Sequence, residues 1–185
     1  MRKFLVLLGT VLLAAAMFLL ILSQYNVHKF QLQAENYVQT LNQLIPKAQS
    51  AAIWQRRDNT MSSLSLDNTD FVGILELPCY NSSLPVCNDW GNISKYPCRF
   101  EGSIYDRSLK IGATSQKGQY DFFREISVGD ELIFTDVEGN SYSLSVSDIR
   151  YSKQADETAL QSENSALTLF IKNVYAFEYI IIFCN

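Results

Sequence analysis

The sequence is poor in the residues on which most protein chemistry depends. Its 185 residues include a single histidine, His28, and its four cysteines follow no CxxC or Cys/His spacing. This pattern gives no zinc-type site, so we expect neither a metal nor a cofactor. A formal net charge of −4 excludes the strongly basic face that nucleic-acid binding needs. There is also no internal repeat, which excludes solenoid and propeller architectures.

The N-terminus carries one long apolar run. It covers residues 4–22 and follows two basic residues. At about 1.5 Å per residue, such a helix matches the roughly 30 Å of a bilayer core. We therefore predict a transmembrane signal anchor over residues 1–25, with a single pass through the cell membrane. Because the basic residues precede the run, the N-terminus is expected in the cytoplasm and the C-terminal domain outside the cell. The alternative is a cleaved signal peptide with its small-residue site at 14–16.

The next segment, residues 26–69, is predicted to be a helical stalk and linker. Apolar residues recur at helical spacing over 27–45, which indicates a helix with one apolar face packed on the domain behind it. The alternative is a solvated stalk. Pro46 interrupts the pattern, and a second helix is expected over 47–57. The Ser-, Thr- and Asn-rich segment 59–68 has the composition of a linker.

Residues 70–185 have the pattern of one all-β domain. Glu138-Gly139-Asn140 is a strong hairpin signal, and the arm that follows it alternates apolar residues with serines. Many short strands with turn signals between them predict a sandwich or a barrel. The expected strands are Phe71–Leu77, Leu84–Cys87, Leu109–Ala113, Glu131–Asp136, Ser141–Arg150, Leu167–Ile171 and Phe177–Cys184.

Five short stretches follow one another in this domain. They are NTDFVGI at 68–74, LPV at 84–86, PCRFEGS at 97–103, VGDELIFTD at 128–136 and LTLF at 167–170. In their order and spacing they resemble the sortases, the cysteine transpeptidases of Gram-positive cell surfaces, and class B sortases in particular. The resemblance implies a mainly β fold. This would be a sortase-like eight-stranded β-barrel with N-terminal helices and a transmembrane helix, whose groove holds a sorting-signal peptide.

The resemblance also implies a catalytic triad that this chain replaces. Active sortases use a cysteine nucleophile, a histidine acid and an arginine that stabilises the oxyanion or positions substrate. The matching positions here are Lys172 for the cysteine, Thr114 for the histidine and Tyr179 for the arginine. A shift of register does not restore the triad, because the domain has no histidine and its last strands have no arginine. No catalytic residues are therefore expected, and the chain is predicted to be a pseudoenzyme.

The leading hypothesis is a peptide- or partner-binding protein linked to cell-surface protein anchoring. Its partner would be a sorting-signal-like peptide, an active sortase or the substrate of one. The groove candidates are Thr114, Ser115, Lys172 and Tyr179. In this interpretation Lys172 is a fixed positive charge that holds an acidic side chain or a C-terminal carboxylate. The equally weighted alternative is that Lys172 extends into solvent or pairs with a carboxylate such as Glu178.

Two other functions remain open from the sequence. One is an atypical transpeptidase or hydrolase that uses Lys172 as the base for Thr114 or Ser115, by analogy with Ser-Lys hydrolases. The other is an unrelated single-pass surface β domain whose pattern imitates the barrel.

The four cysteines are disulfide candidates, because the domain is expected in an oxidising compartment. Four cysteines allow three pairings. Cys98 and Cys184 resemble positions that some sortases also use, and a bridge between them would tether the last strand. Cys79 and Cys87 flank a turn and would clip that hairpin. The alternative of a reactive thiol lacks an obvious cationic setting.

Overall fold

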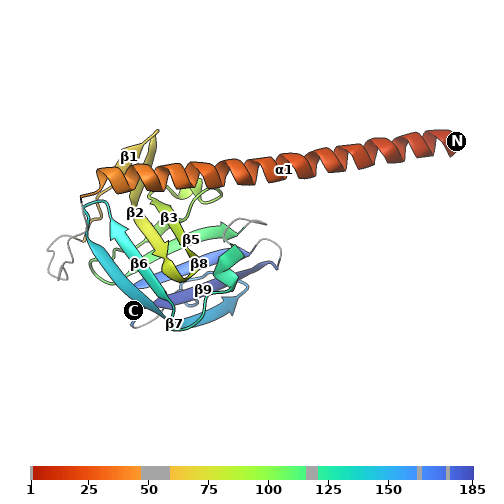
Figure 1. The fold of residues 1–185 in the computed structure, drawn as a ribbon. Coiled ribbons are helices and arrows are strands. Elements are labelled where there is room, and N and C mark those ends of the chain that lie inside the picture. Colours follow the sequence, from red (N-terminus) through yellow and green to blue (C-terminus); the bar gives the residue numbers. More distant parts are fainter. Residues whose placement is uncertain (1, 47–58, 116–120, 162–163, 174–175) are drawn as a thin grey trace.

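The structure is a computed structural model that describes residues 2–46, 59–115, 121–161, 164–173 and 176–185. A single helix, α1 (Arg2–Leu44), extends along one side of a barrel and projects well beyond it (Figure 1). The predicted anchor and the helix predicted over 27–45 are one continuous element. Residues 10–45 contain neither glycine nor proline, so nothing in the sequence breaks the helix. The helix predicted over 47–57 lies outside the described residues.

The N-terminal part of α1 is apolar and exposed. Leu12, Met17 and Ile21 are each more than half exposed. The helix is long and apolar enough to cross a membrane, in keeping with single-pass membrane anchoring.

The barrel consists of short strands that close on themselves. Within the described residues the sheet order is β1-β2-β3-β4-β5-β8-β9-β7-β6, and β2 also pairs with β6. The β2–β6 pairing closes an eight-stranded barrel, which confirms the predicted fold class, and β1 is attached outside it. Only β3–β4 and β5–β8 are parallel pairs among the described strands. The strands are β1 (Leu64–Leu66), β2 (Thr69–Leu77), β3 (Ser82–Cys87), β4 (Cys98–Glu101), β5 (Leu109–Ser115), β6 (Glu131–Asp136), β7 (Ser141–Ser152), β8 (Leu167–Asn173) and β9 (Glu178–Cys184).

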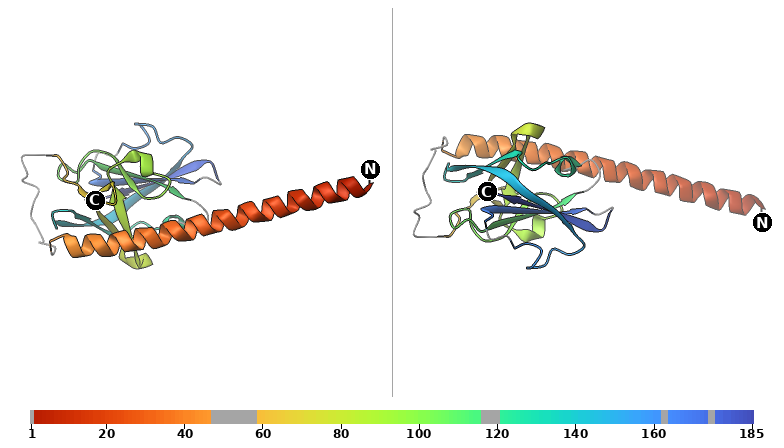
Figure 2. Two further views of the ribbon diagram at one scale, coloured as in Figure 1. Left: turned by 90° about the horizontal axis from the view of Figure 1, so that it is seen from above. Right: turned by 90° about the horizontal axis from the view of Figure 1, so that it is seen from below.

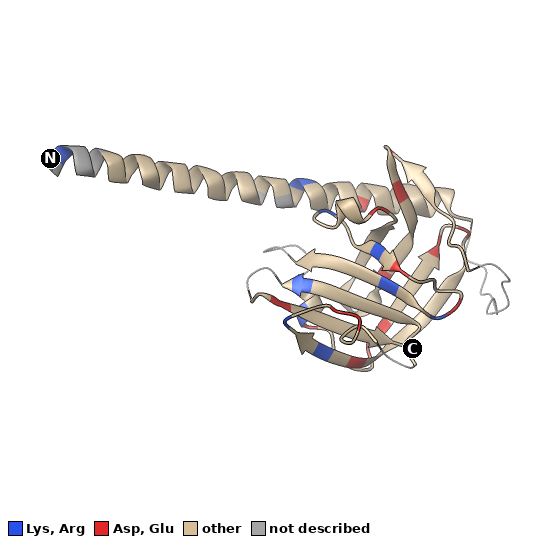
Figure 3. Ribbon diagram, turned by 180° about the vertical axis from the view of Figure 1, so that it is seen from behind, with Lys and Arg blue, Asp and Glu red and all other residues tan. Residues whose placement is uncertain are grey.

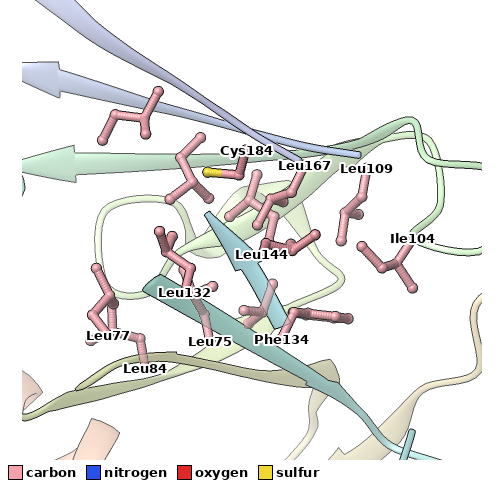
Figure 4. Packing of buried hydrophobic residues seen from close by; sticks show 14 of the residues in the cluster. Leu75, Leu77, Leu84, Ile104, Leu109, Leu132, Phe134, Leu144, Leu167 and Cys184 are labelled. Carbon is pink, nitrogen blue, oxygen red and sulfur yellow. The ribbon is translucent and has the colours of Figure 1, made fainter. Parts of the chain in front are cut away.

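The barrel interior is filled by alternate residues of each strand. In β7, Tyr142, Leu144 and Val146 are buried while the serines between them are exposed or half-buried. The inward-facing residues of the other strands complete one apolar core, part of which is shown in Figure 4. The side-chain period of two residues therefore places every second residue of a strand on the outer face.

A second apolar cluster lies between the barrel and α1. Ala34, Val38 and Leu41 of the helix pack on Phe71 of β2 and on Tyr96. Figure 2 shows the C-terminal part of α1 lying along the barrel, as the apolar periodicity over 27–45 predicts. The outer face is thus covered at β2 and β3, and the helix leaves other strands open.

Two strands were not predicted from the sequence. Strand β1 lies within the segment predicted to be a linker and pairs with β2 through a two-residue turn. The turn residues Asp67 and Asn68 have φ values of 47° and 63°, which is the conformation of a type I′ hairpin turn. Strand β4 is short and carries two charged residues, so it has no apolar alternation to reveal it.

Neither predicted disulfide is formed, and all four cysteines are free thiols. Cys184 lies in the barrel interior, whereas Cys98 lies in the second apolar cluster, between the barrel and α1, which we call the outer cluster. Strands β4 and β9 are also three strand spacings apart, roughly 14 Å. Cys79 precedes β3 and Cys87 is its last residue, so the length of the strand, roughly 17 Å, separates them. Both separations exceed the Cα distance of about 7 Å that a disulfide can span.

Candidate functional site

Three strands place the residues at the triad positions side by side. In the parallel pair β5–β8, Thr114 is opposite Lys172, and in the antiparallel pair β8–β9, Lys172 is opposite Tyr179. Their strand neighbours Ala113, Ile171 and Ile180 are buried in the barrel interior, so the three side chains point to the outer face. We call Thr114, Lys172 and Tyr179 the central row.

Lys172 is the exposed member of this row. Its neighbours on β8 are buried, and Thr114 and Tyr179 are half-buried. Among the described residues, the Lys172 ammonium has no ion-pair or hydrogen-bond partner. The ion pair with Glu178 considered from the sequence does not form, because Glu178 is opposite Asn173, one residue further along β8. The charge of Lys172 therefore faces solvent.

Ser115 does not belong to the outer face. It is 2% exposed and lies opposite Asn173, which is 5% exposed. The Asn173 Oδ1 atom accepts a hydrogen bond of 2.9 Å from Nη2 of Arg124. Ser115 and Asn173 thus face the barrel interior, and only Thr114 of the two hydroxyl candidates shares a face with Lys172.

Three aromatic rings lie next to the central row. Ring centroids are 5.1 Å apart for Trp90 and Phe100, 5.9 Å for Trp90 and Phe170, and 5.5 Å for Phe100 and Phe170. We call these residues the aromatic cluster. Phe170 is buried, but Trp90 is 40% and Phe100 is 49% exposed. Phe170 is two residues before Lys172 on the same face of β8, roughly 7 Å away along the strand.

Gly112 makes room for this cluster. A Cβ atom at Gly112 would lie 2.5 Å from Trp90 Cη2 and 2.8 Å from Phe170 Cζ. The indole therefore lies directly on the backbone of β5. Sequence analysis missed the cluster, because Trp90 comes from a short 3-10 helix (Trp90–Asn92) between β3 and β4, and Phe100 from the unpredicted β4. The available signal was the glycine inside a strand, which often marks a close approach.

Arg150 is the arginine on the outer face of the neighbouring strand β7. Its guanidinium carbon lies 4.5 Å from the ring centroid of Phe183, and its Nε is 2.7 Å from Asp148 Oδ2. Phe183 is opposite Thr168, which precedes Lys172 by four residues, roughly 13 Å along β8. Arg150 therefore does not bring its charge to the central row.

Within the described part of the chain, charge and shape single out no other site as clearly. In Figure 3 acidic and basic residues are scattered over strands and loops, without a uniformly charged face in that view. A polar hollow of about 490 Å³ is lined by Asp106, Arg107, Asn164, Ser165 and Asn185. These residues lie where β5 and β8 begin and β9 ends, at the opposite end of the strands from the central row.

Comparisons with known proteins identify the fold. No protein-family model and no curated protein matches the chain. Among solved structures, sortase C1 from Streptococcus agalactiae is 19% identical with a TM-score of 0.53, over 68% of this chain and 72% of that one. Sortase A from Corynebacterium diphtheriae is 12% identical with a TM-score of 0.54, over 86% and 83%. Sortase A from Listeria monocytogenes is 15% identical with a TM-score of 0.52, over 62% and 86%.

The chain therefore has a sortase-like fold. A domain whose pattern only imitates the barrel is excluded, because the strand order and the structural matches agree on this fold.

Proposed function

We propose that this chain is a membrane-anchored, extracytoplasmic pseudoenzyme of the sortase fold that binds a peptide or a partner protein at the central row. The observation that carries the proposal is the geometry of that row. Lys172 presents an exposed charge between Thr114 and Tyr179, at positions where the resemblance to class B sortases implies a thiol, an imidazole and a guanidinium.

The chemistry of the central row favours binding over transpeptidation. A transpeptidase needs a good nucleophile that is also a good leaving group, a group that titrates near neutrality and a fixed cation for the oxyanion. An amine that attacks a peptide carbonyl makes an amide as stable as the one it breaks, so there is no turnover. The single histidine, His28, is on α1 rather than on the barrel.

The surroundings suggest the kind of ligand. The Lys172 ammonium suits an acidic side chain or a C-terminal carboxylate, and the hydroxyls of Thr114 and Tyr179 suit peptide backbone. The exposed rings of Trp90 and Phe100 suit an apolar side chain roughly two residues away. We propose that the ligand is a sorting-signal-like peptide, or a segment of an active sortase or of its substrate, that combines such an acidic group with such an apolar side chain.

The position of the site suggests where the ligand comes from. Strands β5 and β8 carry Thr114 and Lys172 near their C-terminal ends. In Figures 1 and 2 the arrowheads of these strands point to the side on which α1 extends toward its N-terminus. With α1 as an anchor, this end of the barrel faces the membrane. We therefore favour a partner held in the same membrane, as protein anchoring at the cell surface requires.

Binding is tested with a peptide library and the full chain in detergent micelles. We expect enriched peptides to be acidic or to need a free C-terminus. A charge-assisted hydrogen bond contributes about 1.5–3 kcal/mol, so Lys172→Met should weaken binding roughly 10- to 100-fold. The matched control is Lys110→Met, which removes the same charge from the same face of β5, where Lys110 is paired with Glu101 at 2.6 Å. Equal loss in both variants, or no enrichment at all, would refute the proposal.

An atypical hydrolase or transpeptidase is the second candidate. Thr114 lies directly opposite Lys172 on the same face, which is the arrangement that a lysine base and a hydroxyl nucleophile need. Mass spectrometry of the chain after incubation with enriched peptides separates the two functions. A covalent product or a cleaved peptide that disappears in Lys172→Ala would favour the enzyme, and an unmodified peptide favours binding.

A further inference from the structure

Two of the cysteines are direct neighbours across strands. Cys87 ends β3, Cys98 begins β4, and the two residues are opposite each other in a parallel pairing. The Cys87 N–H donates a 2.8 Å hydrogen bond to the carbonyl of Pro97, which fixes this register. Neighbouring strands lie about 4.8 Å apart, inside the Cα range of about 4.4–6.8 Å that disulfides use.

Both side chains point into the apolar cluster between the barrel and α1. Cys87 and Cys98 are fully buried, and both belong to the outer cluster between the barrel and α1. Cys79 is exposed, and Cys184 lies in the barrel interior, so neither shares that position. The fold therefore selects one pair out of the possible combinations.

Polar contacts distinguish the two sulfurs. The Cys87 Sγ accepts hydrogen bonds from the Asp89 N–H at 3.4 Å and from Asn92 Nδ2 at 3.7 Å. A hydrogen bond from the Cys98 thiol, more than these, lowers the pKa of Cys87 below that of an ordinary thiol. The same hydrogen bond and burial raise the pKa of Cys98. Cys87 is thus the thiol that is more readily ionised.

We propose that Cys87 and Cys98 form a disulfide when the chain folds in the presence of a disulfide oxidant. The Cys87 thiolate attacks the disulfide of the oxidant and releases one thiol, which leaves a mixed disulfide on Cys87. Cys98 then loses its proton, attacks the Cys87 sulfur and releases the second thiol. One oxidant disulfide is reduced to two thiols, and two cysteine thiols are oxidised to one disulfide. Because both sulfurs lie beneath α1 in the folded chain, this exchange takes place after β3 and β4 have paired, which sets the contacts of Cys87, and before α1 covers the two cysteines.

The bridge would have a consequence for the loop between the two cysteines. This loop, residues 88–97, carries Trp90 onto Gly112 and Phe170. The Asp89 carboxylate accepts hydrogen bonds from the Gly91 N–H at 2.9 Å and from Asn92 Nδ2 at 3.1 Å, which shapes the turn. A disulfide would fix both ends of the loop and so hold Trp90 in the aromatic cluster. The inference rests on the fold and does not depend on the proposed binding function.

The test uses the full chain, reduced and unfolded and then refolded in detergent with oxidised and reduced glutathione. Remaining thiols are alkylated in denaturant, and the chain is digested with trypsin. Cleavage after Lys95 and Arg99 isolates Cys98 in a four-residue peptide, 96–99. We expect this peptide to be linked to the peptide of Cys87, two hydrogens lighter than the sum of the two, with Cys184 alkylated. Cys79 and Cys87 lie in the same tryptic peptide, 58–95, so the mass alone does not tell them apart. The Cys79→Ser variant is the matched control and should keep the link.

Stability gives an independent readout. A disulfide that closes a loop of this length should raise the melting temperature of a chain of this size by roughly 5–10 °C over the reduced form. The Cys98→Ser variant should show no such difference between oxidised and reduced conditions. Where that variant fails to fold, the peptide map of the unmodified chain decides alone. Alkylation of both Cys87 and Cys98, a lasting glutathione adduct on Cys87, or a link to Cys79 or Cys184 would overturn the proposal.

Discussion

The inner and outer faces of strands β5, β8 and β9 contrast sharply, although successive residues of the same strands supply them in turn. On the inner face Ile111, Leu169 and Ile182 form one row of neighbours, and all three are buried in the core. On the outer face, one row beyond the aromatic cluster, stand Thr114 and Lys172, where the resemblance implies catalytic groups. The inner face supplies the apolar packing of the barrel, and the outer face carries the hydroxyl of Thr114 and the ammonium of Lys172. The contrast teaches that adjacent residues of one strand can serve different ends, the inner ones core packing and the outer ones the surface on which a site is built.

The contrast is tested most strongly at Leu169. Leu169→Ala removes a side chain that is 2% exposed from the barrel core, and we expect a loss of about 2–5 kcal/mol in the free energy of unfolding. Lys172→Ala, three residues away on the outer face, should change it by about 0.5 kcal/mol or less. Denaturant unfolding of the full chain in detergent measures both. Similar losses in the two variants would contradict the distinction between the faces.

The loss of stability expected at Gly112 is intermediate between those at Leu169 and Lys172. Gly112→Ala places a methyl group against Trp90 and Phe170, which should cost about 1–3 kcal/mol of stability and displace the indole. We expect a changed tryptophan emission in a Trp54→Phe background. Ser145→Ala, on the exposed face of β7, serves as the control and should leave both properties unchanged. Unaltered emission in Gly112→Ala would show that the indole does not lie on β5.

A graft sharpens the comparison for the central row. Lys172→Cys combined with Thr114→His places a thiol and an imidazole on neighbouring strands, about 4.8 Å apart at the backbone. The imidazole should lower the pKa of the introduced thiol by about one unit from its usual value near 8.5. The alkylation rate of the corresponding peptide as a function of pH measures this shift against Lys172→Cys alone. Identical pH profiles would mean that the two side chains do not meet.

The smallest effect is expected at a contact that belongs to neither face. The Tyr80 hydroxyl donates a 2.7 Å hydrogen bond to Asp130, which, with the Ser127 N–H, lowers the pKa of that carboxyl. A lowered pKa in the folded state stabilises the chain above the unfolded pKa, and this contribution disappears as pH falls through the folded value. The stability difference between the natural chain and Tyr80→Phe should therefore shrink below about pH 4. A difference that grows on acidification would contradict this assignment.

Most of the barrel could be predicted from the sequence, because alternation and turn residues are local signals. The hairpin at Glu138-Gly139-Asn140 and the strands beside it have the predicted bounds within two residues. Strand β4 was missed because it is four residues long and carries two charges, so it shows no apolar alternation. Because β4 was not predicted, no signal in the sequence indicated that Cys87 and Cys98 are neighbours.

The outer face was harder to predict than the core. The positions of Thr114, Lys172 and Tyr179 followed from a resemblance, and strand register places them together. Ser115 was placed on the wrong face, since one residue of shift reverses the direction of a strand side chain. The aromatic cluster could not be predicted, because Trp90 and Phe170 are 80 residues apart and meet only through tertiary packing.

The account is tested most directly by pairing the charge on the protein with the charge on the ligand. An enriched acidic peptide and its carboxamide analogue are titrated against the full chain and against Lys172→Met, which gives four binding constants. We predict that the carboxylate and Lys172 are coupled by at least about 1.4 kcal/mol, a tenfold effect on affinity that neither change alone explains. A coupling near zero, with the peptide still bound by the Lys172→Met chain, would contradict the central claim.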